Sequence, residues 1–130
     1  MEVKINGINF ANLIVDIKRR GKIVYSENKG TTLANTEVLD PMGTKIYYSL
    51  TIDSMYKDQR LLERFWEEII KPRTEGFEIE VPYNQTTLKF KGYVDGEFSQ
   101  ALVQAFANRN IWGDISVDIY PIKPQFTEVW

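Results

Sequence analysis

Two short runs of alternating charge are the first places in this sequence where side chains could do chemistry. Glu78 and Glu80 stand two residues apart, so in a strand both carboxylates would lie on one face, as an acid–base pair requires. Lys89 and Lys91 have the same spacing, and folding the chain about residues 84–85 sets Glu80 opposite Lys89 and Glu78 opposite Lys91. A lysine opposite each acid favours cross-strand ion pairs over catalysis.

The sequence lacks the residues and motifs of most catalytic and metal sites. It has no histidine and no cysteine, which removes the commonest general base, the commonest transition-metal ligand and any thiol nucleophile. Residues 30–32 lack the lysine and the preceding glycine of a phosphate-binding loop, and no nucleophile elbow occurs. We therefore predict that the protein is not an enzyme and has no catalytic, cofactor-binding or metal-binding residues. Two carboxylates distant in sequence could still converge in space, so a hydrolase stays open as an alternative.

The most basic run of the chain is Lys18-Arg19-Arg20-Gly21-Lys22. One interpretation is a contact with phosphate groups, for which lysine and arginine are common side chains. The other is a solvated strand end or turn. We favour the second interpretation, because no aromatic stacking platform adjoins the run in the sequence.

Length and composition narrow the class of protein. The chain has 130 residues, 43% hydrophobic and 26% charged, which is typical of one folded domain spanning 1–130. The formal net charge of −2 gives no bulk attraction to nucleic acid or to an anionic membrane. No apolar run is long enough to cross a membrane, and the N-terminal residues lack the apolar run of a signal peptide. We expect the protein to be cytosolic when made.

The segment from Asp58 to Lys71 is predicted to be a long helix that covers a sheet. Asp58 is a candidate N-cap, and Pro72 prevents the helix from continuing because it lacks an amide hydrogen. Charged residues, Glu67 and Glu68 among them, are expected on the solvated face. The apolar residues recur with the helical period and gather on the opposite face: Leu61, Leu62, Phe65, Trp66 and Ile69.

A tight hairpin is predicted at the N-terminus. Asn6-Gly7 is the dipeptide most typical of a two-residue turn, and it sets Ile5 opposite Ile8 and Val3 opposite Phe10. Strands are also predicted at residues 13–17, 23–25, 44–53, 77–81, 88–91 and 115–120.

Three segments between these strands have other expected structures. Asp40-Pro41-Met42-Gly43 and Asn108-Arg109-Asn110 are interpreted as turns. Residues 98–106 fit either helix or strand, and strand is favoured because the last strand could pair back on them. The whole pattern predicts an α+β fold, mainly an antiparallel β-sandwich or barrel with one covering helix.

Two segments have the character of oligomer contacts. Residues 26–37 are polar with a small apolar centre at Leu33, which suits an arm that becomes ordered on a neighbouring subunit. The residues after Pro121 carry Phe126 and Trp130 beyond the last strand, where a monomer would have to expose them, and aromatic anchors are enriched in interface cores. Leu33, Phe126 and Trp130 are therefore predicted interface residues. The alternative is that both segments fold back on their own domain.

Several short motifs occur in a characteristic order along nearly the whole chain. Gly43-Thr44 leads into a tyrosine-rich strand, and Pro72 ends the helix. The other motifs of this series are Val3-Lys4-Ile5-Asn6-Gly7-Ile8, Val81-Pro82-Tyr83-Asn84-Gln85 and Ile111-Trp112-Gly113. In this order the chain resembles small tail structural proteins, of the tail-tube and baseplate type, from long-tailed phages and prophages of Gram-positive bacteria.

The resemblance implies a structural role. It implies a ring of identical subunits around the DNA channel, with six as the expected number, and contacts with neighbouring tail proteins. DNA would be passing cargo without specific binding, and no cofactor or membrane is implied. The protein would reside in the host bacterial cytoplasm during assembly and then in the virion tail. A stand-alone carbohydrate- or peptide-binding β-module remains an alternative, with aromatic residues available to line its surface: Tyr83, Tyr93, Trp112 and Tyr120.

Overall fold

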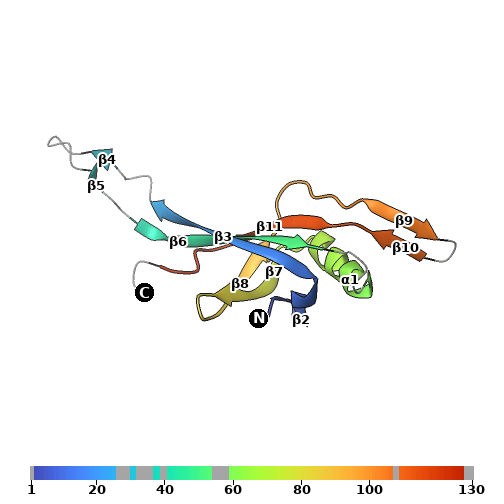
Figure 1. The fold of residues 1–130 in the computed structure, drawn as a ribbon. Coiled ribbons are helices and arrows are strands. Elements are labelled where there is room, and N and C mark those ends of the chain that lie inside the picture. Colours follow the sequence, from blue (N-terminus) through green and yellow to red (C-terminus); the bar gives the residue numbers. More distant parts are fainter. Residues whose placement is uncertain are drawn as a thin grey trace.

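The chain folds as a small α+β domain, mostly antiparallel sheet with a helix packed against it (Figure 1). A computed structural model describes residues 2–25, 30–31, 37–38, 41–53, 59–106 and 109–127. The elements are β1 (Lys4–Ile5), β2 (Ile8–Asn9), η1 (Ala11–Leu13), β3 (Ile14–Tyr25), β4 (Gly30–Thr31), β5 (Glu37–Val38), β6 (Pro41–Ile52), α1 (Gln59–Ile70), β7 (Phe77–Tyr83), β8 (Thr86–Tyr93), β9 (Leu102–Phe106), β10 (Arg109–Trp112) and β11 (Ile115–Pro121).

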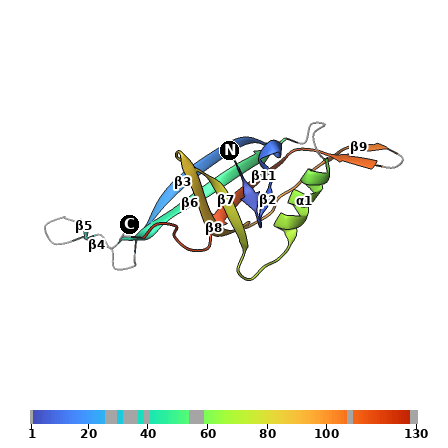
Figure 2. The ribbon, with the colours of Figure 1, turned by 90° about the horizontal axis from the view of Figure 1, so that it is seen from below.

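The main sheet has seven strands in the order β2-β1-β7-β8-β11-β6-β3. β11 joins its two halves, because residues 115–119 pair with β6 whereas residues 120–121 pair with β8. The two end strands of this order, β2 and β3, follow one another in the chain and are separated only by a single turn, η1. The sheet must therefore curl so that its two ends approach each other, and the curl is visible in Figure 2.

The core lies between the curled sheet and α1. Alternating residues of β6 point inward, as the sequence predicts: Ile46, Tyr48, Leu50 and Ile52 are all buried. Leu62, Phe65 and Ile69 of α1 are buried against them, and the ring of Phe65 meets that of Phe10 edge-on at 5.3 Å between centroids. Burying each such side chain stabilises the fold by roughly 1.5–3 kcal/mol. The predicted helix 58–71 is thus confirmed within one residue at its C-terminal end, while its proposed cap Asp58 lies outside the described residues.

The two predicted hairpins around α1 are confirmed, with one difference. Ile5 pairs with Ile8 at the N-terminus, and in the β7–β8 hairpin Glu80 pairs with Lys89 and Glu78 with Lys91, as expected. The ion pair, however, is diagonal: Lys89 contacts Glu78 rather than Glu80. Long side chains on a twisted sheet reach a diagonal neighbour as readily as the residue directly opposite.

Two predicted turns are wrong in the residues that the structure describes. The basic run Lys18 to Lys22 lies in the middle of the continuous 12-residue strand β3, not at a strand end or turn. Pro41 and Gly43 belong to β6, where they pair with Tyr25 and Val24 of β3. Pro41 is the first residue of its strand, where its missing amide hydrogen costs little. Asp40 lies outside the described residues.

The strand predicted within residues 98–106 is confirmed as β9, but its partner differs. β9 pairs with β10, which includes Arg109 and Asn110 of the expected turn, whereas β11 pairs with β6 and β8. β9 and β10 form a separate two-stranded sheet at one end of the molecule. The small β4–β5 sheet lies at the other end, as Figures 1 and 2 both show.

Candidate interaction surfaces

The β9–β10 hairpin projects from the domain and exposes apolar side chains. Residues 101–105 are all exposed, and Leu102 and Val103 are 47% and 58% accessible. A two-stranded hairpin without a sheet or helix on its faces is marginally stable in water. Exposed apolar residues on such an element are typical of a contact with another molecule.

The base of this hairpin is fastened to α1 and to the preceding loop. The amide of Gly113 donates to the carbonyl of Ala101 at 2.7 Å, and the Gln100 side chain donates to the Gly113 carbonyl at 2.7 Å. The amide of Trp112 donates to Oε1 of Gln59 on α1 at 3.2 Å. These bonds hold the base of the hairpin to the domain.

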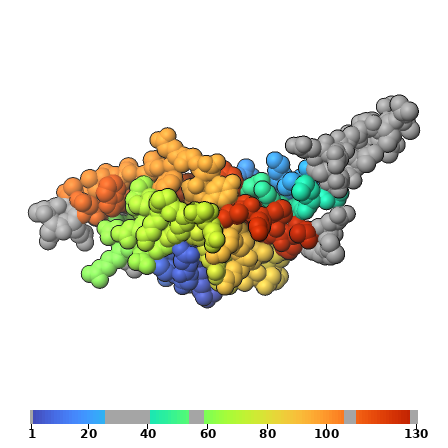
Figure 3. All heavy atoms as spheres, turned by 180° about the vertical axis from the view of Figure 1, so that it is seen from behind, coloured from blue at the N-terminus to red at the C-terminus, as the bar shows by residue number. Residues whose placement is uncertain are grey.

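An apolar hollow lies on a different face, at the C-terminal end of α1. It encloses about 510 Å³. Ile70, Tyr93 and Ile122 are exposed in it although they are apolar or aromatic. Figure 3 views the molecule from behind and shows the green, orange and red surfaces of the contributing segments meeting on this face. We call this surface the apolar hollow and define it by Ile70, Phe77, Tyr93, Val94, Phe98 and Ile122. Lys71, Arg73 and Thr74 also line it.

A narrower groove of about 290 Å³ separates α1 from the base of the β9–β10 hairpin. Trp66 and Trp112 line it together with the polar side chains of Glu63, Glu67 and Gln100. Trp66 also packs edge-on against Phe98, with 5.3 Å between ring centroids. Aromatic surface beside a few polar groups is the usual composition of a small-molecule site.

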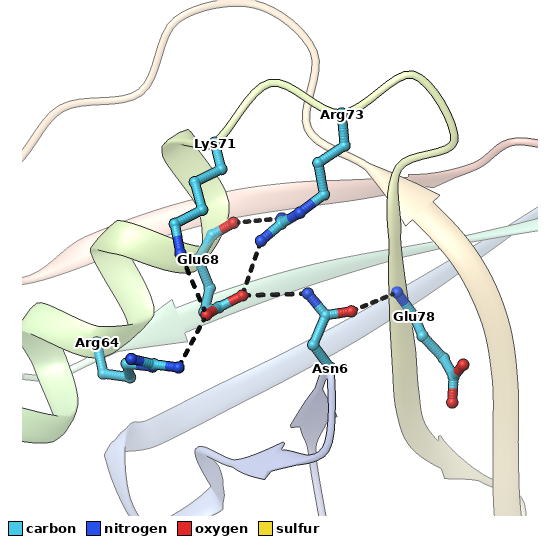
Figure 4. A network of polar contacts seen from close by, with 6 residues as sticks. All are labelled: Asn6, Arg64, Glu68, Lys71, Arg73 and Glu78. Carbon is cyan, nitrogen blue, oxygen red and sulfur yellow. Dashed lines mark hydrogen bonds and ion pairs between the residues drawn. The ribbon is translucent and has the colours of Figure 1, made fainter.

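Glu68 forms a buried polar network that the sequence analysis missed (Figure 4). Its side chain is only 5% accessible, although the helical period places it among solvated charges. Arg73 Nη2 lies 2.9 Å from its Oε2, and Arg64 and Lys71 lie 3.4 and 3.8 Å from its Oε1. The Asn6 side chain donates to Oε2 at 3.1 Å. Arg64 and Lys71 stand four residues before and three residues after Glu68, a spacing that predicts ion pairs on a helix. No such spacing indicates the contact with Asn6, which is distant in the sequence.

The network links α1 to both flanking hairpins. Asn6 lies at the turn of β1–β2 and has a φ of 51°. Its side-chain Oδ1 accepts a hydrogen bond from the backbone amide of Glu78 at 3.1 Å, and its backbone amide donates to the Glu78 carbonyl at 2.8 Å. Burial raises the pKa of Glu68, but the Asn6 hydrogen bond and the charges of Lys71 and Arg73 outweigh it, so the pKa lies below its usual value. Glu68 is thus an ionised structural clamp and not a proton donor.

The predicted interface residues are only partly within the described chain. Leu33 and Trp130 lie outside it. Phe126 packs on its own domain: its carbonyl accepts the Thr44 amide at 2.7 Å, and its ring lies 5.4 Å from that of Tyr83. The Gln125 side chain bonds both backbone groups of Ile46, at 2.8 and 2.9 Å. The expectation that a monomer must expose Phe126 is therefore wrong, because this segment pairs with the start of β6.

Comparison of the chain with protein-family models found no match, and comparison with curated proteins found none either. In the part of the chain that the structure describes, no three His, Cys, Asp or Glu side chains gather as a metal site. Across the same residues, no helix has both the length and the apolar composition needed to span a bilayer.

Proposed function

We propose that the protein is a non-catalytic structural subunit of a phage or prophage tail, in the tail tube, tail tip or baseplate, and that it assembles into a ring. The observation that carries the proposal is the projecting β9–β10 hairpin, with Leu102 and Val103 exposed on it. Such a hairpin gains stability when a second molecule covers it. The kind of assembly is taken from the resemblance described above.

The second copy of the chain is the proposed occupant of the apolar hollow. The hairpin and the hollow are different surfaces, so a contact between them is heterologous. Such contacts close into a ring when the rotation from one subunit to the next is a whole fraction of a full turn. Leu102 and Val103 of one subunit would cover Ile70 and Ile122 of the next, which are likewise exposed. Six subunits is the number that the resemblance implies.

The finer architecture belongs to the same proposal. The curled sheet would close into a barrel-like or sandwich-like body, from which the β9–β10 hairpin extends toward a neighbouring subunit. Neighbouring tail proteins would bind the remaining faces. DNA would pass through the ring as cargo without specific binding, and the protein would move from the host bacterial cytoplasm into the virion tail.

The oligomeric state tests the proposal directly. Light scattering after size exclusion, native mass spectrometry and negative-stain images should show a closed ring, alone or with co-expressed tail proteins. The double variant Leu102→Glu/Val103→Glu should abolish it. Val15→Glu/Ile23→Glu is the matched control, because Val15 and Ile23 are similarly exposed, at 53% and 54%, but lie on β3. A monomer under all of these conditions, or equal loss of assembly in the control, would overturn the proposal.

A stand-alone carbohydrate- or peptide-binding module is the second candidate, and the groove with Trp66 and Trp112 favours it. Indole rings offer flat apolar surface, while Glu63, Glu67 and Gln100 offer hydrogen-bonding groups. Titration calorimetry with panels of oligosaccharides and short peptides tests this candidate. Binding by the wild type that Trp66→Ala removes would support it, and no binding across the panels would exclude it.

A further inference from the structure

Three tyrosines from three neighbouring strands form a row on the outer face of the sheet. Tyr93 of β8 pairs directly with Tyr120 of β11, and their ring centroids lie 5.6 Å apart. The ring of Tyr120 lies 5.5 Å from that of Tyr47 on β6. Tyr47 alternates with the buried residues Ile46 and Tyr48, so the row lies on the face away from the core. Tyr93, Tyr120 and Tyr47 are called the tyrosine row.

The basic strand β3 continues this row. Arg20 pairs with Tyr47, and its guanidinium carbon lies 5.6 Å from the centroid of the Tyr47 ring. Lys18 and Lys22 stand two residues on either side of Arg20 and so share its face, and Lys45 of β6 lies opposite Lys22. Within the described part of the chain, none of these three lysines forms an ion pair.

Two acidic groups share this face, and they lie beside Lys18 rather than beside Lys22 and Lys45. Asp118 of β11 pairs with Ser49, whose hydroxyl donates to the Asp118 carboxylate at 2.6 Å, and Asp16 pairs with Thr51 further along. Lys22 and Lys45 stand at the opposite end of the strands. The face therefore has a cationic end next to an aromatic row, although the whole chain carries a net charge of −2.

The structure thus supplies the aromatic platform whose absence from the sequence argued against a phosphate contact. We propose that this face binds single-stranded nucleic acid without sequence preference. Bases would stack on the tyrosine row, and Lys18, Arg20, Lys22 and Lys45 would neutralise phosphates along the strand. A duplex fits less well, because its base faces are hidden in the stack and cannot reach the tyrosines. Tyr93 also lines the apolar hollow, so this face and the proposed ring contact share that side chain.

Fluorescence anisotropy with a labelled oligothymidylate of about 20 nucleotides tests the proposal. For a single strand, the logarithm of the binding constant falls linearly with the logarithm of the salt concentration. Each lysine or arginine that neutralises a phosphate makes this slope steeper by about 0.7. Lys18→Glu/Lys22→Glu should weaken binding at least about tenfold and flatten this dependence. Lys4→Glu/Lys123→Glu makes the same change of net charge elsewhere and should leave binding nearly intact.

A second variant separates stacking from charge. Tyr93→Ser, at a residue that is 40% exposed, should weaken binding while keeping the salt dependence of the wild type. Circular dichroism and thermal melting verify that each variant is folded. The proposal is overturned if wild type binds no oligonucleotide at low salt, if it prefers a duplex of equal length, if Tyr93→Ser binds as wild type does, or if the control double variant loses as much affinity as the test variant.

Discussion

The ammonium nitrogen of Lys89 lies 2.6 Å from Oε1 of Glu78, although the strand register places Lys91 opposite Glu78. The Lys89 hydrogen bond accordingly lowers the pKa of Glu78 from its ordinary value. We expect Lys89→Met to raise the pKa of Glu78 more than Lys91→Met does, because Lys91 acts on it only through a more distant charge. NMR titration of the Glu78 side chain measures both shifts. A larger effect of Lys91→Met would show that the pair is not diagonal in solution.

The β7–β8 register was predictable because two independent patterns agree on it. Around one turn, charges meet charges and apolar residues meet apolar residues, and a slip of one residue would break both matches. The basic strand β3 was not predictable in the same way. Residues 18–23 are exposed, so no apolar alternation marks them as a strand. The extension of β3 depends on pairing with β6, which no local pattern reveals.

The candidate surfaces were less predictable than the fold, for a related reason. The tyrosine row combines residues of β6, β8 and β11, and it exists only because β11 pairs with both other strands. Glu68 was misplaced because the helical period describes one helix alone. Its burial comes from Asn6 and Arg73, which belong to the segments on either side. A helix or a tight hairpin carries its own pattern in the sequence, whereas a contact among segments far apart in the chain leaves no local pattern.

Removing the charge of Glu68 should destabilise the domain. We expect Glu68→Gln to lower the free energy of unfolding by about 1–3 kcal/mol, because the contacts with Arg73 and Asn6 lose their charge while the site stays buried. The matched control is Glu67→Gln, since Glu67 is exposed on the same helix and should change stability by less than about 0.5 kcal/mol. Urea denaturation measures both. Equal effects of the two variants would show that the network contributes nothing specific.

The same carboxylate should make stability depend on pH. The pKa of Glu68 is lowered in the folded state, so its contribution is complete above the unfolded pKa of about 4.3 and is lost as the pH falls through the folded value. The difference in unfolding free energy between wild type and Glu68→Gln should therefore shrink as the medium becomes more acidic than about pH 4.3. Denaturation at a series of pH values tests this expectation. A difference that stays constant into strong acid would contradict it.

Gly43 is needed for the C-terminal segment to reach β6. Its φ is +151°, and a Cβ atom there would lie 2.6 Å from the Phe126 carbonyl oxygen and 2.9 Å from Cβ of Pro124. Gly43→Ala should cost about 1–3 kcal/mol through backbone strain and displacement of this segment. Gly21→Ala is the control, because no atom lies within 4 Å of its Cβ position. Thermal unfolding of the two variants measures the difference, and similar melting temperatures would refute the argument.

Hydrogen exchange should distinguish the projecting hairpin from the rest of the sheet. Among the residues that the structure describes, β9 has β10 as its one neighbouring strand, whereas β7 has β1 on one side and β8 on the other. In the monomer we therefore expect β9 amides to exchange much faster than those of β7, since local opening of the hairpin disturbs little of the core. Burial of Leu102 and Val103 by a second subunit should slow exchange in β9 and leave β7 unchanged. Mass spectrometry of protein labelled at low and high concentration measures both strands, and β9 exchange that stays fast in the assembled protein would exclude this hairpin from the interface.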